Sequence, residues 1–290
     1  MEALKQIIPL LLTFSLAGLV LTVGLKSEAG DLLYVLRRPK LLLKAILAVD
    51  VIPPVAAAIL IWFLPLEPMV KAGIMLMAIS PVPPLVPGQE LKAGGRKEYA
   101  YGVYTAMALL TIIVVPLVFD LAARLFGRDD VLPIVTIART VATGVLLPLG
   151  IGLVIGRLAP KVSQAVAPWI FRLSMLLVVL AFVPILVQIW PVITGLVGNG
   201  TIVAMVALVV VCLAGGHLLG GPDPADRGTL AIASSVRHPG IAMLLANTAF
   251  NDKQVTAAVL LFMLVGMVVG ALYKIWFKRT RKAAPPVTAG

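Results

Sequence analysis

The chain has 290 residues, of which 60% are hydrophobic and only 13% are charged. A water-soluble domain carries roughly a quarter charged residues because its surface faces water, so this composition excludes an ordinary soluble protein. The net charge of +11 does not indicate a nucleic-acid partner, because the basic residues form short clusters between long apolar runs. We therefore expect an integral membrane protein.

Apolar stretches of bilayer-spanning length recur along the whole chain. A hydrocarbon core about 30 Å thick needs about 20 helical residues. These stretches are longer than the ~10 residues of a barrel strand, and they do not alternate in polarity. We predict an all-α membrane protein with about nine transmembrane helices, at residues 5–25, 41–64, 67–93, 98–123, 131–157, 166–189, 192–219, 226–248 and 254–277.

The basic residues that flank these segments fall mostly on one side of the membrane. The positive-inside rule places that side in the cytoplasm. It predicts an N-terminus outside, a cytoplasmic C-terminus and a location in the cell (inner) membrane. The basic stretch from Lys278 to Lys282 would anchor the last helix at the membrane surface, and residues 283–290 are expected to form a disordered tail.

Prolines interrupt the third segment. It contains the sequence SPVPPLVPG from Ser80 to Gly88, and each proline removes a backbone donor and clashes with the preceding turn. We therefore expect a break in the membrane, followed by a second half-helix that begins near Gln89 and Glu90. The Glu90 carboxylate could take part in proton coupling there, or it could simply stabilise the positive end of the half-helix.

A second interruption occurs in the eighth segment. Its sequence SSVRHPG runs from Ser234 to Gly240 and places Arg237 and His238 directly before a proline. A charged residue inside the membrane needs a partner or a water-filled cavity. His238 titrates near neutral pH and could shuttle protons, or it could be a hydrogen-bonded structural residue.

The two interruptions match in spacing. Pro84 lies four positions after Ser80, and Pro239 lies four positions after Ser235. Broken helices at corresponding positions of two halves are typical of transporters whose binding site lies at the membrane midplane. We predict an inverted repeat of four and five helices in which the two broken helices cross. Ordinary proline kinks are the alternative interpretation.

Several motifs resemble the bile acid:sodium symporter family. They are Gly24-Leu25-Lys26 with the following VLRRPK at 35–40, Asp50 shortly before Pro53-Pro54, the proline-rich break, and PGIA at 239–242. The resemblance implies alternating-access transport of organic anions, often coupled to sodium. It also implies a panel domain, here residues 1–35 and 130–190, and a core domain, here 36–129 and 191–282, that holds the crossed helices.

This sequence departs from that family at the implied sodium ligands. Val86-Pro87 stand where the family has a Ser-Asn pair, and Ala233 and Arg237 stand near its glutamate and glutamine. These side chains offer no oxygen ligand, so we expect no sodium coupling through the usual sites. We hypothesise that Asp50 pairs with Arg237 and mimics the bound ion. Alternatively, each faces a separate water-filled cavity.

Three further polar residues are candidates. Tyr104 and Thr105 lie on the fourth segment, which the family resemblance places beside the ion sites. Arg139 lies in the fifth segment among threonines, where it could attract an anion or bind a neighbouring carbonyl or carboxylate.

The sequence as a whole predicts a secondary active transporter of a small organic anion. The alternative is a sodium-independent facilitator, or a non-transporting binding or sensor protein. We expect no enzyme, metal or cofactor chemistry, because no metal-ligand spacing, catalytic nucleophile or phosphate-binding glycine motif is present. The expected partners are the anion, the lipid bilayer and, in a proton-coupled variant, protons; the oligomeric state is not indicated. The predicted binding residues are Asp50, Ser80, Pro84, Gly88, Gln89, Glu90, Tyr104, Thr105, Arg139, Ser234, Ser235, Arg237, His238 and Gly240.

Overall fold

The computed structural model describes residues 2–125 and 133–283, and these residues form helices with no strand among them. The first half contains α1 (Glu2–Lys26), α2 (Ala29–Leu36), α3 (Pro39–Ile46), the π-helix η1 (Leu47–Val51), α4 (Ile52–Phe63), α5 (Pro68–Ile79), α6 (Val86–Lys92) and α7 (Lys97–Leu125). The second half contains α8 (Ile134–Val141), the π-helix η2 (Ala142–Leu146), α9 (Leu147–Leu158), α10 (Pro160–Gly195), α11 (Thr201–Leu219), α12 (Pro224–Ser235), α13 (Pro239–Ala249) and α14 (Lys253–Ala283). The predicted tail after residue 283 and the start of the fifth predicted segment lie outside the described residues.

The helices confirm the predicted all-α membrane fold. Seven helical stretches are long and apolar enough to cross a bilayer, and the number rises to eight if α1 and α2, bent by 85° at their junction, count as one span. The sequence predicts about nine spans. The difference lies at the third predicted segment, because its prolines divide it into α5, with 12 residues, and α6, with 7 residues. Neither piece is long enough to cross a bilayer alone.

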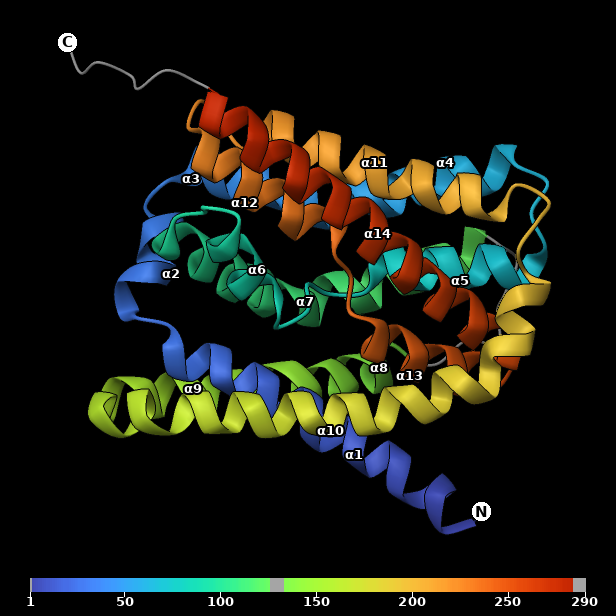
Figure 1. The fold of residues 1–290 in the computed structure, drawn as a ribbon, viewed down its shortest axis with the longest axis horizontal. Coiled ribbons are helices and arrows are strands. Elements are labelled where there is room, and N and C mark those ends of the chain that lie inside the picture. The colour runs from blue at the N-terminus through green and yellow to red at the C-terminus, as the bar shows by residue number, and fades with distance from the viewer. Residues whose placement is uncertain (1, 126–132, 284–290) are drawn as a thin grey trace.

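Three helices form one layer of the molecule. Figure 1 shows α1, α9 and α10 side by side along one edge, and α1 packs against both of the others. The remaining helices lie on the other side of this layer, with α14 crossing the front of the view. The hydroxyl of Ser163 on α10 donates a hydrogen bond to the carbonyl of Leu25 on α1 at 2.6 Å. The layer therefore combines apolar packing with a buried polar contact.

Two glycines allow α1 and α9 to approach closely. A Cβ atom on Gly152 would lie 2.9 Å from the Cα of Gly24 and would also collide with the carbonyl of Leu21. Small residues at such crossings are typical of helix pairs in membranes, because association there depends on close van der Waals packing.

We predict that Gly152→Ala destabilises the protein by about 1–3 kcal/mol, because the added methyl meets backbone atoms that cannot rotate away. Gly150→Ala, two residues earlier on the same helix, is the matched control, because a Cβ there meets nothing within 4 Å. Thermal unfolding of the two purified variants in the same detergent checks this. Equal midpoints for the two variants would contradict the close-packing interpretation.

Candidate functional site

The two predicted helix breaks are present, and they touch each other. Residues 80–85 separate α5 from α6, and residues 236–238 separate α12 from α13. The backbone amide of His238 donates to the carbonyl of Pro81 at 3.0 Å and to the hydroxyl of Ser80 at 3.2 Å. A broken helix leaves amides and carbonyls without intrahelical partners, and here one break supplies partners for the other.

We call this contact between the two breaks the crossing. A third segment, the π-helix η1, presents to it carbonyls that have no donor within their own helix. The amide of Ile52 bonds to the carbonyl of Leu47, five residues back. The next two residues, Pro53 and Pro54, have no amide hydrogen to donate. The carbonyls of Ala48 and Val49 therefore lose their normal helical donors, and buried carbonyls need replacements.

Arg237 and Ser234 supply the replacement donors. The guanidinium Nη2 of Arg237 donates to the carbonyls of Val49 at 2.7 Å and Ser234 at 2.8 Å, and Nη1 donates to the carbonyl of Ser80 at 3.2 Å. The hydroxyl of Ser234 donates to the carbonyl of Ala48 at 2.7 Å. Arg237 is only 5% exposed. One buried cation thus joins η1, the first break and the end of α12.

The hypothesised ion pair between Asp50 and Arg237 is not formed by direct contact. The two charges interact through space, but no ion pair joins them. The Oδ2 atom of Asp50 is buried without a hydrogen-bond partner among the described residues, and so is the Nε of Arg237. The physical reason is the set of free carbonyls beside Asp50, which occupy both terminal nitrogens of the guanidinium.

A cavity of about 310 Å³ lies directly beside the crossing, and we call it the crossing cavity. Residues of α5, α6, α11, α12, α14 and the second break line it. Its polar lining residues are Gln89, Ser235, Arg237 and Lys274. The ammonium of Lys274 donates to the side-chain oxygen of Gln89 at 3.0 Å, which ties α14 to α6 across the cavity.

A second cavity, of about 220 Å³, lies between α6 and the layer formed by α1 and α10; we call it the interlayer cavity. It shares Gln89 with the crossing cavity, and its other lining residues include Lys26, Lys92 and Tyr101. A Cβ atom on Gly88 would meet nothing within 4 Å, so the wall is open at that point. The ammonium of Lys26 lies 5.3 Å from the ring centroid of Phe171.

The charged side chains that line the two cavities are all basic. Basic side chains line them, whereas no acidic side chain does in the part of the chain that the structure describes. Clefts lined by one sign of charge focus the electric field and attract ligands of the opposite sign. The basic lining residues are Arg237 and Lys274 in the crossing cavity and Lys26 and Lys92 in the interlayer cavity.

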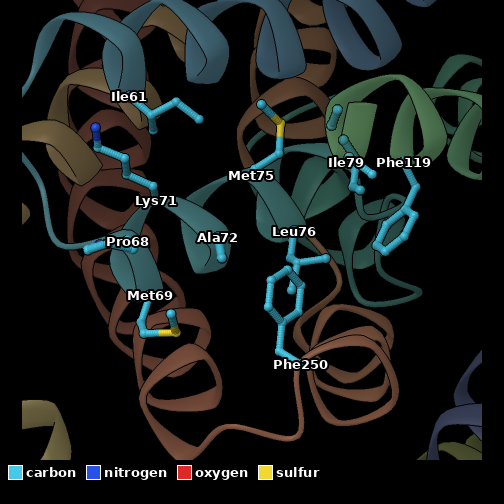
Figure 2. Close-up of a pocket in the computed structure, with 12 residues that line it drawn as sticks. Ile61, Pro68, Met69, Lys71, Ala72, Met75, Leu76, Ile79, Phe119 and Phe250 are labelled. Atoms are coloured by element: carbon cyan, nitrogen blue, oxygen red, sulfur yellow. The ribbon is translucent and has the colours of Figure 1, made fainter. Parts of the chain in front are cut away.

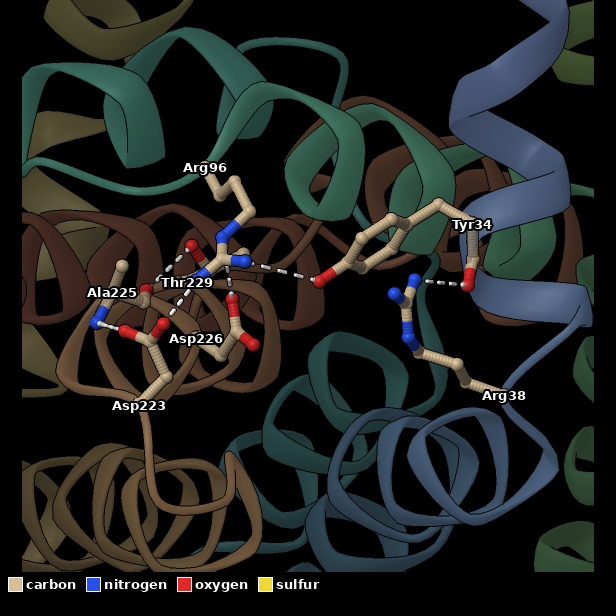
Figure 3. A network of polar contacts seen from close by, with 7 residues as sticks. All are labelled: Tyr34, Arg38, Arg96, Asp223, Ala225, Asp226 and Thr229. Carbon is tan, nitrogen blue, oxygen red and sulfur yellow. Dashed lines mark hydrogen bonds and ion pairs between the residues drawn. The ribbon is translucent and has the colours of Figure 1, made fainter.

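An ionic cluster links the segment after α6 to the N-terminal end of α12, at the ends of these half-helices that lie away from the breaks (Figure 3). Arg96, just after α6, forms an ion pair with Asp223 and a longer one, at 3.8 Å, with Asp226, and it contacts the hydroxyl of Tyr34 on α2 at 3.5 Å. Asp223 also caps α12 by accepting from the amide of Ala225 at 2.8 Å.

The charge of Arg96 is secured by this cluster. Burial alone would lower the pKa of Arg96, but the neighbouring Asp226 and Asp223 hold it above its ordinary value. The guanidinium therefore stays cationic across the physiological pH range and keeps α6 and α12 connected.

Another hollow, of about 260 Å³, lies among α4, α5, α7 and the end of α13 (Figure 2). Its wall consists mainly of apolar side chains such as Leu76 and Phe250, with Lys71 as the charged group. Binding sites for charged ligands need several convergent polar groups to fix orientation. This hollow is therefore a weaker candidate site than the crossing cavity.

Residues 13–196 match the family described as the sodium bile acid symporter family. The chain belongs to that family. The match covers α1 to α10 and includes the first break, whereas the second break with Arg237 lies beyond it. None of the curated proteins matches the chain. Membership in a symporter family, together with the apolar helices, identifies a multi-pass integral membrane protein of the transporter type.

The structure gathers most of the predicted site residues of this symporter-family protein around the crossing. Pro84, Gly88 and Gln89 line the interlayer cavity, and Ser235 and Arg237 line the crossing cavity. The remaining crossing residues serve as hydrogen-bonding or packing elements there: Ser80, Ser234, His238 and Gly240.

His238 has a structural role in this arrangement. It is 2% exposed, and its Nδ1 accepts a hydrogen bond from the amide of Ile241 at 3.3 Å, which caps α13. Of the two interpretations of His238, the geometry favours the structural one over the proton shuttle.

Other predicted residues do not line the two cavities. Arg139 is exposed on α8 and lines neither of them, so it does not join the site. Tyr104, Thr105 and Glu90 are buried, and their side-chain oxygens have no hydrogen-bond partner among the residues that the structure describes.

Sequence reasoning missed three lysines of this symporter-family site. By sequence, Lys26, Lys92 and Lys274 are basic residues that flank apolar segments, which indicates membrane orientation, yet all three line a cavity. A usable signal exists for Lys92, because it lies three residues after Gln89 and therefore on the same face of a helix. Lys274 carries no comparable local signal.

We predict that Ser234→Ala lowers the stability of the protein by about 1 kcal/mol, because the carbonyl of Ala48 loses its donor. Ser235→Ala is the matched control, since the hydroxyl of Ser235 bonds only within its own helix, to Ile232 at 3.2 Å. Thermal unfolding in detergent measures both. A larger loss in Ser235→Ala than in Ser234→Ala would argue against the crossing contacts described above.

Proposed function

We propose that the protein is a secondary active transporter of a small organic anion, and that the anion binds in the crossing and interlayer cavities. The observation that carries this proposal is the charge of their lining. Arg237 and Lys274 line the first cavity and Lys26 and Lys92 the second, with no acidic side chain described in either. A cleft lined by one sign of charge favours a ligand that brings the opposite sign.

The hydrogen bonds of the cavity support an anion more specifically. Lys274 is bound to the neutral amide oxygen of Gln89, and Arg237 is bound to backbone carbonyls. No described carboxylate forms an ion pair with either cation. Charged groups away from water are stabilised most by an opposite charge, and a bound carboxylate would supply one.

We also propose that transport proceeds by alternating access. Residues 1–35 and 130–190 would act as a panel domain, and residues 36–129 and 191–282 as a core domain. The interlayer cavity supports this division, because Lys26 and Phe171 line it from one side and Gln89 and Lys92 from the other. The protein would sit in the cell membrane with its N-terminus outside and its C-terminus in the cytoplasm.

Sodium coupling at the crossing is not part of the proposed mechanism. A sodium ion requires several oxygen ligands, and the carbonyls of Val49, Ser80 and Ser234 already accept from the guanidinium. Arginine has no acceptor atom and keeps its charge at all relevant pH values. A fixed cation in this position supports transport that is independent of sodium at these sites.

Counterflow in proteoliposomes tests the proposal. Vesicles preloaded with pyruvate, succinate, benzoate or cholate should take up the same labelled carboxylate against its concentration gradient. Lys274→Gln should raise the half-saturation concentration about tenfold, which corresponds to about 1.4 kcal/mol for one charged contact. Lys40→Gln, an exposed lysine on α3 away from both cavities, should leave it unchanged.

Two outcomes would count against this proposal. Vesicles that exchange none of the four carboxylates would favour a non-transporting protein. Equal effects of Lys274→Gln and Lys40→Gln would show that general surface charge, and not the crossing cavity, attracts the anion.

A further inference from the structure

Glu90 is the most completely buried carboxyl group near the cavities. It is 1% exposed, and neither of its two carboxyl oxygens has a hydrogen-bond donor within reach among the described residues. It lies on α6 directly after Gln89, which lines both cavities. The half-helix therefore presents a polar ligand-facing residue and a buried carboxyl group at adjacent positions.

The half-helix α6, which carries Glu90, packs against α7 and α12. These helices bring the buried residues Tyr99 and Tyr101, on α7, and Asp226, on α12, to this region. The hydroxyl of Tyr99 and the Oδ1 of Asp226 likewise have no hydrogen-bond partner in the described part of the chain. The basic residue of this region, Arg96, is engaged by the ionic cluster of Figure 3.

Two of these residues also belong to features described above. Tyr101 lines the interlayer cavity. Asp226 belongs to the ionic cluster through its ion pair with Arg96. Carboxyl groups inside the membrane are typical members of proton relays in pumps and transporters.

The Glu90 carboxyl group is buried and has no hydrogen-bond donor among the described residues, and this determines which protonation state is the more stable. An ionised carboxylate loses its hydration on burial, and no cation or amide replaces the lost water at Glu90. The neutral acid avoids this cost. We propose that Glu90 is the proton-binding site that couples the transported anion to a proton gradient, an inference that rests on the proposed transport function.

The chemistry of the coupling is a simple proton transfer. A proton from water on one side of the membrane forms an O–H bond with a carboxylate oxygen of Glu90, and the same bond breaks when α6 rehydrates on the other side. No electron is transferred. Protonation removes a negative charge next to Gln89 and the cationic cavities, which strengthens anion binding. By thermodynamic linkage, a bound anion favours protonation equally, so both would move together.

Infrared spectroscopy of the full-length protein in lipid tests the proton site without any substrate. The wild type at neutral pH should show the carbonyl stretch of a protonated carboxylic acid, and Glu90→Gln should remove that band. Glutamine has the shape and hydrogen-bonding groups of the neutral acid, so the fold should persist. Glu98→Gln, an exposed carboxyl-to-amide change on α7, is the control and should keep the band. An unchanged band in Glu90→Gln would overturn the proposal.

Proteoliposomes with a trapped pH-sensitive dye test the coupling. Uptake of pyruvate, succinate, benzoate or cholate should acidify the lumen in the wild type and in Glu98→Gln. In Glu90→Gln, proton movement should fall to the level of protein-free vesicles while carboxylate exchange continues. Carboxylate uptake without proton movement in the wild type would overturn the coupling and leave the proposed transport function intact. A wild type that exchanges no carboxylate would overturn both.

Discussion

The contact between the guanidinium of Arg237 and three backbone carbonyls is the interaction on which the centre of the molecule depends. Unwound backbone inside a membrane must find partners within the protein, since lipid offers none. Here the carbonyls of Val49, Ser80 and Ser234 come from three different segments, and one side chain binds them all. The prolines that break the helices create the unsatisfied groups, and the arginine satisfies them.

A permanent cation at the crossing has consequences for its surroundings. Its guanidinium binds backbone carbonyls and no carboxylate in direct contact, and the same side chain lines the adjoining crossing cavity. Lys274 lines the same cavity and ties α14 to Gln89 on α6. The buried Glu90 lies on the same half-helix, directly after Gln89. Under the proposed coupling, the protonation of Glu90 and the binding of the anion favour each other.

The sequence was sufficient for the class of the protein and for the places where its helices break, because composition and proline positions act locally. It could not identify the partners of Arg237, since they depend on the π-helix η1 and on carbonyls that are distant in the chain. The same limit explains why the expected direct contact between Asp50 and Arg237 is wrong. That expectation rests on the attraction of opposite charges and leaves out the carbonyls freed by Pro53 and Pro54. Lys274 and Gln89, 185 residues apart, show no local pattern at all.

We propose that a fixed arginine takes the place of a bound sodium ion in this member of a sodium symporter family. This proposal can be tested without knowing the substrate, because an ion that binds the folded state raises its thermal stability as the ion concentration increases. The measurement is the unfolding midpoint of the purified protein in lipid nanodiscs, in sodium, potassium and choline chloride at equal ionic strength. The account predicts the same midpoint in all three salts. A midpoint that rises with sodium concentration alone would contradict it.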